Sequence, residues 1–171
     1  MSNADPKRRI GLRSIGVLSE RELSECPGVP SPQRLKAGPV VVIECNEEIP
    51  CNPCETLCEK GAIRIGQPIT NTPVLEEEKC GGCGLCLAPC PGLAIFLVDA
   101  SNPDRELVSF PFEFLPLPER GQIVDGLDRS GQVVTEAEVL RIQNPVHNNH
   151  TPIITLRVPP GYGMKVRSIR L

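Results

Sequence analysis

Apolar residues in this chain occur in short runs that proline, glycine or charged residues interrupt. Runs of this length that are rich in β-branched residues predict strands. The middle of the chain repeats one order twice: a strand, a cysteine-bearing loop, a short helix and a return strand. The expected strands are 40–44, 62–65, 74–78 and 94–98, and the expected helices lie within 51–58 and 83–90.

Residues 1–38 are expected to form an N-terminal arm with one short helix and a proline-rich connector. Ser19 followed by Glu22 is a capping-box pattern, in which each side chain accepts a hydrogen bond from the other residue's backbone N–H. The helix that it starts should end near Glu25, because Pro27 cannot continue it.

Residues 100–171 are expected to form a small C-terminal antiparallel β module. Phe110, Phe112 and Phe114 alternate with other residues, which places all three on one face of a strand. That face is either the core of the module or a surface that lies against a partner subunit. Short strands separated by turn residues favour a small sheet or barrel. Further strands are expected at 122–124, 132–134, 139–143, 153–158 and 165–170.

Eight of the nine cysteines lie between residues 45 and 90, in two runs. The second run, from Cys80 to Cys90, has the spacing C-x2-C-x2-C-x3-C and is followed by proline. An offset of 32 residues (86 − 54) superimposes the last three cysteines of the first run on those of the second. The same offset places Glu48 opposite Cys80, the first cysteine of the second run. Because no cysteine stands at position 48, Cys45 is the expected first ligand of the first run. Thiolates at such intervals suit iron–sulfur clusters.

These motifs resemble those of two-cluster bacterial-type ferredoxins, over roughly residues 39–98. The resemblance implies an α+β fold for residues 39–99, a ferredoxin-like two-cluster domain in which the duplicated strand–loop–helix–strand unit encloses two [4Fe–4S] clusters. The fourth cysteine of each run is expected to cross to the other cluster. One cluster would be bound by Cys45, Cys51, Cys54 and Cys90, and the other by Cys80, Cys83, Cys86 and Cys58.

The first motif departs from the ferredoxin pattern in two places. The displaced Cys45 leaves Glu48 as a rival oxygen ligand, and Glu59 replaces the proline that usually follows the fourth cysteine. Zinc ribbons also contain C-x2-C pairs, but three consecutive ligands followed by a fourth favour iron–sulfur over zinc. The odd number of cysteines, at cluster spacings in a chain that is expected to be cytoplasmic, favours metal over disulfides. The ninth thiol, Cys26, has no partner at cluster spacing and is expected to be an inert buried side chain rather than a ligand.

The composition limits what the chain can do alone. Its 171 residues fit one domain or two small ones, and its net charge of −3 shows no bias toward nucleic acid. A polar N-terminus and the lack of 18 consecutive apolar residues predict a cytoplasmic chain without a membrane span. Because no phosphate-binding or dinucleotide motif occurs, no catalytic residue is assigned. Basic residues near the ends, such as Arg167, are either solvated or dock against acidic subunits.

Three further stretches, Ile15–Gly28, Gly92–Asp99 and Phe110–Pro118, resemble the small iron–sulfur subunits of FAD-dependent amino-acid, imino-acid or opine dehydrogenases. Such complexes contain a flavoprotein related to sarcosine oxidase, a second flavoprotein and often a [2Fe–2S] chain. The resemblance implies an electron-transfer subunit of a hetero-oligomer, with FAD-containing dehydrogenase subunits as partners. The alternatives are a free-standing extended ferredoxin and a binding module whose clusters are structural.

Overall fold

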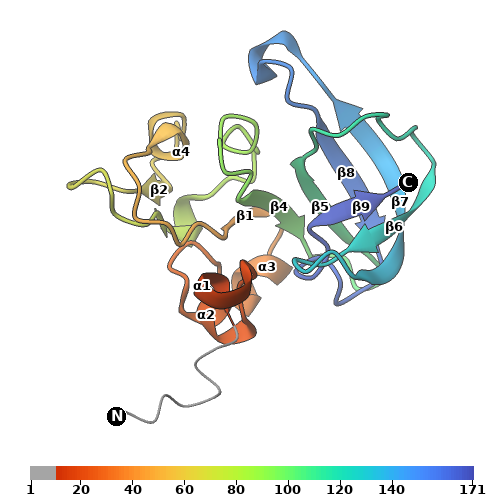
Figure 1. The fold of residues 1–171 in the computed structure, drawn as a ribbon, viewed down its shortest axis with the longest axis horizontal. Helices are drawn as coiled ribbons and strands as arrows, with labels where there is room; N and C mark the ends of the chain where they lie inside the picture. Colours follow the sequence, from red (N-terminus) through yellow and green to blue (C-terminus); the bar gives the residue numbers. More distant parts are fainter. Residues whose placement is uncertain (1–10) are drawn as a thin grey trace.

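The computed structural model describes residues 11–171, so predictions for residues 1–10 lie outside the described part of the chain (Figure 1). The helices are short: α1 Leu12–Ile15, α2 Glu20–Glu25, α3 Pro32–Lys36 and α4 Pro53–Thr56, with 3-10 turns η2 Glu77–Lys79 and η3 Val146–Asn148. The strands are β1 Val40–Ile43, β2 Ile63–Arg64, β3 Val74–Leu75, β4 Ile95–Asp99, β5 Glu106–Pro111, β6 Ile123–Leu127, β7 Val133–Gln143, β8 Ile153–Val158 and β9 Ser168–Arg170. None of the helices within residues 11–171 is long and apolar enough to cross a membrane.

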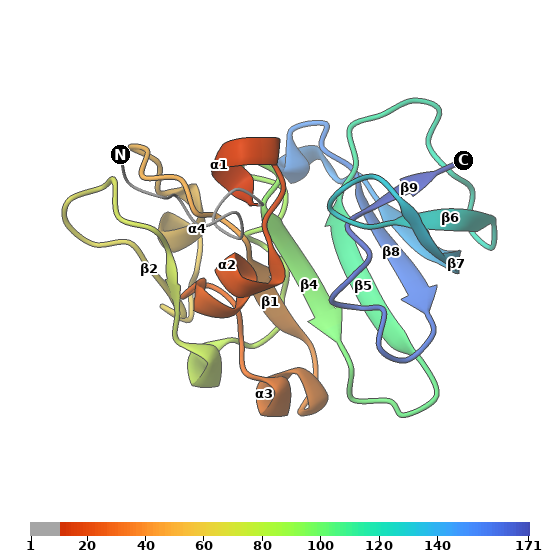
Figure 2. The same cartoon turned by 60° about the horizontal axis from the view of Figure 1, so that its bottom comes forward.

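Seven of the strands form one antiparallel sheet in the order β1-β4-β5-β8-β7-β6-β9, and β2 pairs with β3 apart from it. The predicted fold class, a small α+β ferredoxin-like two-cluster domain followed by a separate β module, is therefore wrong. The large sheet runs through both predicted parts, and few residues are helical. The helices and cysteine loops lie at the β1 end of this sheet, and β5 to β9 form its other end (Figure 2).

The reason for the difference lies in β4, which hydrogen-bonds to a neighbour along both of its edges. Val42 of β1 is opposite Phe96 on one side, and Val108 of β5 is opposite Val98 on the other. The predicted helices around the cysteines also shrink: α4 is one turn long, and residues 83–90 contain turns only. With so little helix, the sheet dominates the architecture.

Strand β4 also separates two hydrophobic cores, because its side chains alternate between two faces. Ile95 and the partly buried Leu97 pack in the cysteine core, which contains β1 residues and several cysteines. Phe96 and Val98 pack in the sheet core, which contains buried residues of β5 to β9. The rings of Phe96 and Phe110 lie 6.3 Å apart between centroids. One strand therefore contributes to both halves of the molecule.

The three alternating phenylalanines do not share one environment. Phe110 and Phe112 are 1% and 4% exposed in the sheet core, whereas Phe114 is 67% exposed. Because β5 ends at Pro111, the alternation does not continue to Phe114. Two of the rings thus follow the core interpretation, and the third lies on the surface with its ring 5.5 Å from that of Phe112.

The capping box at the start of α2 is confirmed. The Ser19 hydroxyl accepts from the Glu22 N–H at 3.3 Å, and the Glu22 carboxylate accepts from the Ser19 N–H at 2.8 Å. The same carboxylate accepts from the N–H of Leu12, which joins α1 to α2. These bonds lower the pKa of Glu22, with the Ser19 backbone N–H as the main cause. Residues 12–15, expected to be extended, instead form a single helical turn.

Candidate metal centres

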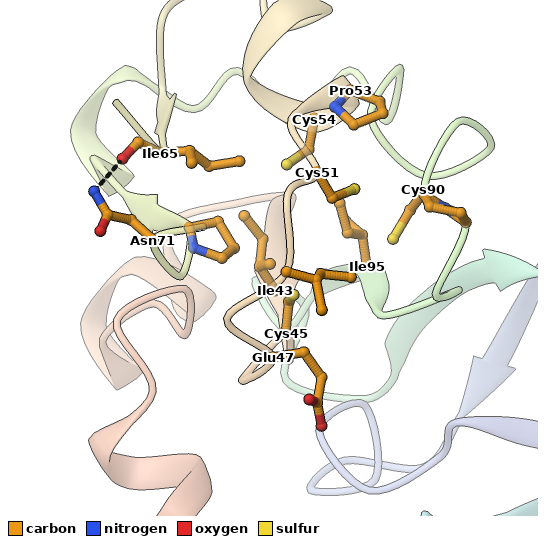
Figure 3. A pocket seen from close by; sticks show the side chains of 13 residues that line it. Ile43, Cys45, Glu47, Cys51, Pro53, Cys54, Ile65, Asn71, Cys90 and Ile95 are labelled. Atoms are coloured by element: carbon orange, nitrogen blue, oxygen red, sulfur yellow. Dashed lines mark hydrogen bonds between the residues drawn. The ribbon is translucent and has the colours of Figure 1, made fainter. Parts of the chain in front are cut away.

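Four cysteines surround a pocket between the end of β1, α4 and the approach to β4 (Figure 3). They are Cys45, Cys51, Cys54 and Cys90. Three come from the first cysteine run, and Cys90 is the last cysteine of the second run. Isoleucine side chains complete much of the wall: Ile43, Ile49, Ile65 and Ile95. The pocket therefore presents four sulfurs from two chain segments in a largely apolar setting.

A second pocket is lined by the other four cysteines of the two runs. Cys58, the last cysteine of the first run, lines it together with Cys80, Cys83 and Cys86. Its apolar wall includes Val41 and Ile63, and Cys83 is the one exposed cysteine among those in the described residues. The two sets of four are the same sets as in the crossed assignment, while cluster binding itself stays a prediction. Within residues 11–171, no three potential ligands converge closely enough to hold a single metal ion.

The fourth cysteine of each run accepts a hydrogen bond at sulfur from the backbone. The Ala62 N–H donates to Cys58 Sγ at 3.2 Å, and the Ala94 N–H donates to Cys90 Sγ at 3.5 Å. The 32-residue repeat (94 − 62) thus extends to this contact. Backbone N–H groups aimed at sulfur stabilise the thiolate and raise the potential of a bound cluster.

In the chain without bound metal, burial raises the pKa of two of the thiols, Cys54 and Cys86. Burial raises the pKa of Cys54 to about 11, with a smaller contribution from the nearby Cys90. It raises the pKa of Cys86 to about 12, and Cys80 and Cys83 add to the shift. Such thiols are neutral at pH 7, so metal binding must displace their protons and supply the positive charge that holds the thiolates together.

Glycine at position 82 is required where the second run passes the sheet. Gly82 has φ +67°, and a Cβ there would lie 2.6 Å from the carbonyl oxygen of Pro39. Only a residue without a side chain allows this approach and this backbone conformation at no cost. The loop that carries Cys80 and Cys83 is therefore fixed against the residue that precedes β1.

Cys26 and Glu48 both lie outside the two sets. The Cys26 side chain is 5% exposed and donates its S–H to the Ile43 carbonyl at 3.2 Å. It lines neither of the two cysteine pockets, in keeping with the expectation of a buried thiol. Glu48 is exposed and does not line the first pocket, whereas its neighbour Glu47 does. The rival oxygen ligand thus gains no support.

Sequence reasoning missed four charged side chains that hold the cysteine loops. Arg34 bonds the backbone of the second run, and Glu44, directly before Cys45, pairs with Arg129 and Arg167. Arg167, expected to be solvated or to dock, is only 8% exposed. The contact of Arg34 with Cys80 spans 46 residues and that of Arg167 with Glu44 spans 123, so cysteine spacing holds no signal of them. The Ser31-Pro32 start signal of α3, which carries Arg34, was the one available clue.

The chain is similar over short stretches to three known proteins. It is 43% identical over 49 residues to a component of the ion-translocating oxidoreductase complex of Methanosarcina acetivorans, covering 29% of this chain and 17% of that protein. It is 32% identical over 59 residues to an uncharacterized ferredoxin of Methanocaldococcus jannaschii, covering 34% of each. It is 30% identical over 98 residues to Protein Pixie of Drosophila melanogaster, covering 47% of this chain and 16% of that protein.

These similarities span about a third or less of the relatives' own lengths. No protein-family model matches the chain, and no solved structure matches it significantly. Two of the three relatives agree with the coarser resemblance of the cysteine motifs, that of a ferredoxin-like iron–sulfur protein. The finer resemblance, to a subunit of a flavin-dependent dehydrogenase complex, stays a prediction.

Proposed function

We propose that the protein is an electron-transfer subunit that binds two [4Fe–4S] clusters and serves a flavin-dependent dehydrogenase acting on an amino acid or related amine. The observation that carries this proposal is the gathering of eight thiols into two sets of four, each drawn from both cysteine runs and each around its own pocket. Clusters of this type supply single-electron exchange at potentials that their surroundings set.

The residues present fit such clusters. Soft thiolate ligands select iron–sulfur clusters or zinc, and each pocket offers four of them. A structural zinc site draws four sulfurs to about 2.3 Å from one ion. Within residues 11–171, the sulfurs line the two pockets without three of them converging closely enough to hold one ion. This arrangement favours a larger inorganic body over a single zinc ion.

The chain's own contribution is to hold and surround the thiols. Ile43 and Ile95 exclude water from one side of the first pocket. The Ala62 and Ala94 N–H groups bond the sulfurs that cross between runs. Both sets border β1, because Ile43 lines the first pocket and Val41 lines the second. This proximity supports a relay between the two sites.

The role as a subunit rests on the part of the chain outside the cysteine region. Phe114, Leu115 and Val146 are 67%, 87% and 99% exposed, the highest values among the large apolar side chains of the described residues, and they lie just beyond the ends of β5 and β7. A partner that covers these side chains would account for them. The similarity to a protein named as a subunit of an oxidoreductase complex is a further support. A free-standing extended ferredoxin is the second candidate.

Anaerobic purification followed by iron and sulfide analysis tests the cluster proposal. About eight irons per chain, with the electron paramagnetic resonance of a reduced [4Fe–4S] cluster, is the expected result. Cys26→Ala is the matched control, because it removes a buried thiol outside both sets and should leave the iron content unchanged. Zinc in place of iron would refute the proposal. Co-expression with flavoproteins encoded beside the gene tests the subunit role, which fails if the chain elutes alone.

A further inference from the structure

Arg34 ties the beginning of the second cysteine run to the beginning of the sheet. Its guanidinium donates to four backbone carbonyls, those of Cys80 at 2.7 Å and of Gly38, Pro39 and Glu77 at 3.1 Å each. The helix that carries Arg34 is itself held to this turn, because the Glu77 carboxylate accepts from the Ser31 N–H at 2.6 Å and from its hydroxyl at 2.8 Å. A planar fork with five donors is suited to such a convergence of carbonyls.

A second group of arginine contacts, made to Glu44, lies at the beginning of the first cysteine run. The Glu44 side chain is 6% exposed and accepts from Arg129 Nε and from Arg167 Nε, each at 2.8 Å. Arg167 is 4% exposed at its side chain, and its guanidinium lies 4.5 Å from the centre of the Phe96 ring. One buried anion thus pairs with two cations at the residue directly before Cys45.

We propose that these arginines are positioning residues for the two cysteine sets. Arg34 positions the set that contains Cys80. Arg129 and Arg167, acting through Glu44, position the set that contains Cys45. This inference rests on the proposed function. In each case the arginine binds a residue at the beginning of a cysteine run. Arg34 binds Cys80, directly after η2, and the other two arginines bind Glu44, directly after β1. Arg34 lies in α3, whereas Arg129 lies in the turn between β6 and β7 and Arg167 directly precedes β9. Each cysteine set is therefore positioned by a different part of the chain.

The positive charges of these arginines should affect the reduction potentials of the proposed clusters. Reduction adds a negative charge to a cluster, and a fixed positive charge in a partly desolvated site favours that state. Removal of an arginine therefore lowers the reduction potential of the adjacent site, whereas removal of the Glu44 charge raises it. A role limited to holding the fold would give no such reversal of sign. Arg167 stays charged at pH 7 even though burial lowers its pKa to about 10.

The test compares six variants of the full chain, prepared anaerobically: Arg34→Gln, Arg34→Lys, Arg129→Gln, Arg129→Lys, Glu44→Gln and Arg21→Gln. Arg129 is chosen because its side chain is 14% exposed and Arg167 remains to pair with Glu44, so the fold should persist. Arg21, which is 83% exposed at its side chain, is the matched control. Iron content, unfolding of the metal-free chain and a redox titration followed by electron paramagnetic resonance are measured for each.

The expected result is that Arg34→Gln lowers one of two potentials and Arg129→Gln lowers the other. Glu44→Gln raises the potential that Arg129→Gln lowers, and Arg21→Gln changes neither. Loss of about half of the iron in Arg34→Gln or Arg129→Gln, with a folded metal-free chain, also supports separate anchoring. Arg129→Lys keeps the charge and should retain the wild-type potentials, whereas Arg34→Lys keeps the charge but loses the planar fork and should lower the iron content.

Equal shifts of both potentials in every variant would overturn the inference, as would no shift in either arginine variant. Shifts of the same sign in Glu44→Gln and Arg129→Gln would overturn the electrostatic part. Wild-type protein that binds no iron would instead refute the proposed function, so the two failures can be told apart.

Discussion

Replacing Phe110 by alanine removes the largest side chain among the residues that are almost fully buried in the sheet core. Phe110 is 1% exposed, and its ring packs against that of Phe96 on β4. Truncation of a buried phenylalanine costs about 3–5 kcal/mol, from lost burial and from the cavity left behind. With a loss of about 4 kcal/mol and a urea m-value of about 2 kcal/mol/M, the midpoint of unfolding falls by about 2 M.

The assay is urea unfolding of the full chain, followed in parallel by circular dichroism and, for the proposed clusters, by the release of iron. Because β4 contributes Phe96 to the sheet core and Ile95 to the cysteine core, Phe110→Ala should shift both transitions together. Phe114→Ala is the matched control, since that ring is 67% exposed and its removal should cost no more than about 0.5 kcal/mol. If Phe110→Ala shifts the dichroism but leaves iron release unchanged, the shared strand does not couple the halves.

Three further perturbations have defined outcomes. Gly82→Ala adds a Cβ 2.6 Å from the Pro39 oxygen at φ +67°, so about 1–3 kcal/mol of strain should lower the iron content, whereas Gly81→Ala, with open space around it, should not. Ser19→Ala removes the cap of α2 and should cost about 1 kcal/mol by thermal unfolding, and an unchanged stability would contradict this. The Ser130 hydroxyl, then backbone N–H groups, lower the pKa of Asp128, so its stabilising effect is present at pH 7 and is lost as the pH falls below about 4. The difference in stability between Asp128→Asn and the wild type should therefore shrink as the pH falls from 7 toward 2, by chemical denaturation, and a constant difference would refute this.

Local patterns were sufficient for the features that depend on neighbours in the sequence. The β-branched run before Cys45 is a strand, as expected, and so are Ile153–Val158. The capping box of Ser19 and Glu22 forms because both partners lie within one helical turn. The repeat offset of 32 residues (94 − 62) persists in the N–H contacts to Cys58 and Cys90.

Features that depend on distant partners could not be obtained in this way. An open strand edge accepts any compatible strand, so alternation in β4 does not reveal that β5 pairs along its second edge. Two short expected strands, 132–134 and 139–143, form one strand of 11 residues, β7, because β6 and β8 pair along its length. The contact between Arg129 and Glu44 spans 85 residues. Arginine and glutamate are usually exposed, so nothing in the sequence marks these two as a buried pair.

The cysteine loops have little regular structure of their own with which to hold eight thiols. Helix α4 is four residues long, and β2 and β3 are two residues each, so propensity and local hydrogen bonds cannot fix them. Their rigidity comes from the sheet. All four residues of β1 are at most 2% exposed although β1 is an edge strand, because the cysteine loops and the Gly28 carbonyl cover it. Strand β5 in turn covers the far edge of β4, and the segments that precede β7 and β9 supply both counter-charges of Glu44. The strands and turns that follow the cysteines are thus a structural part of the candidate site.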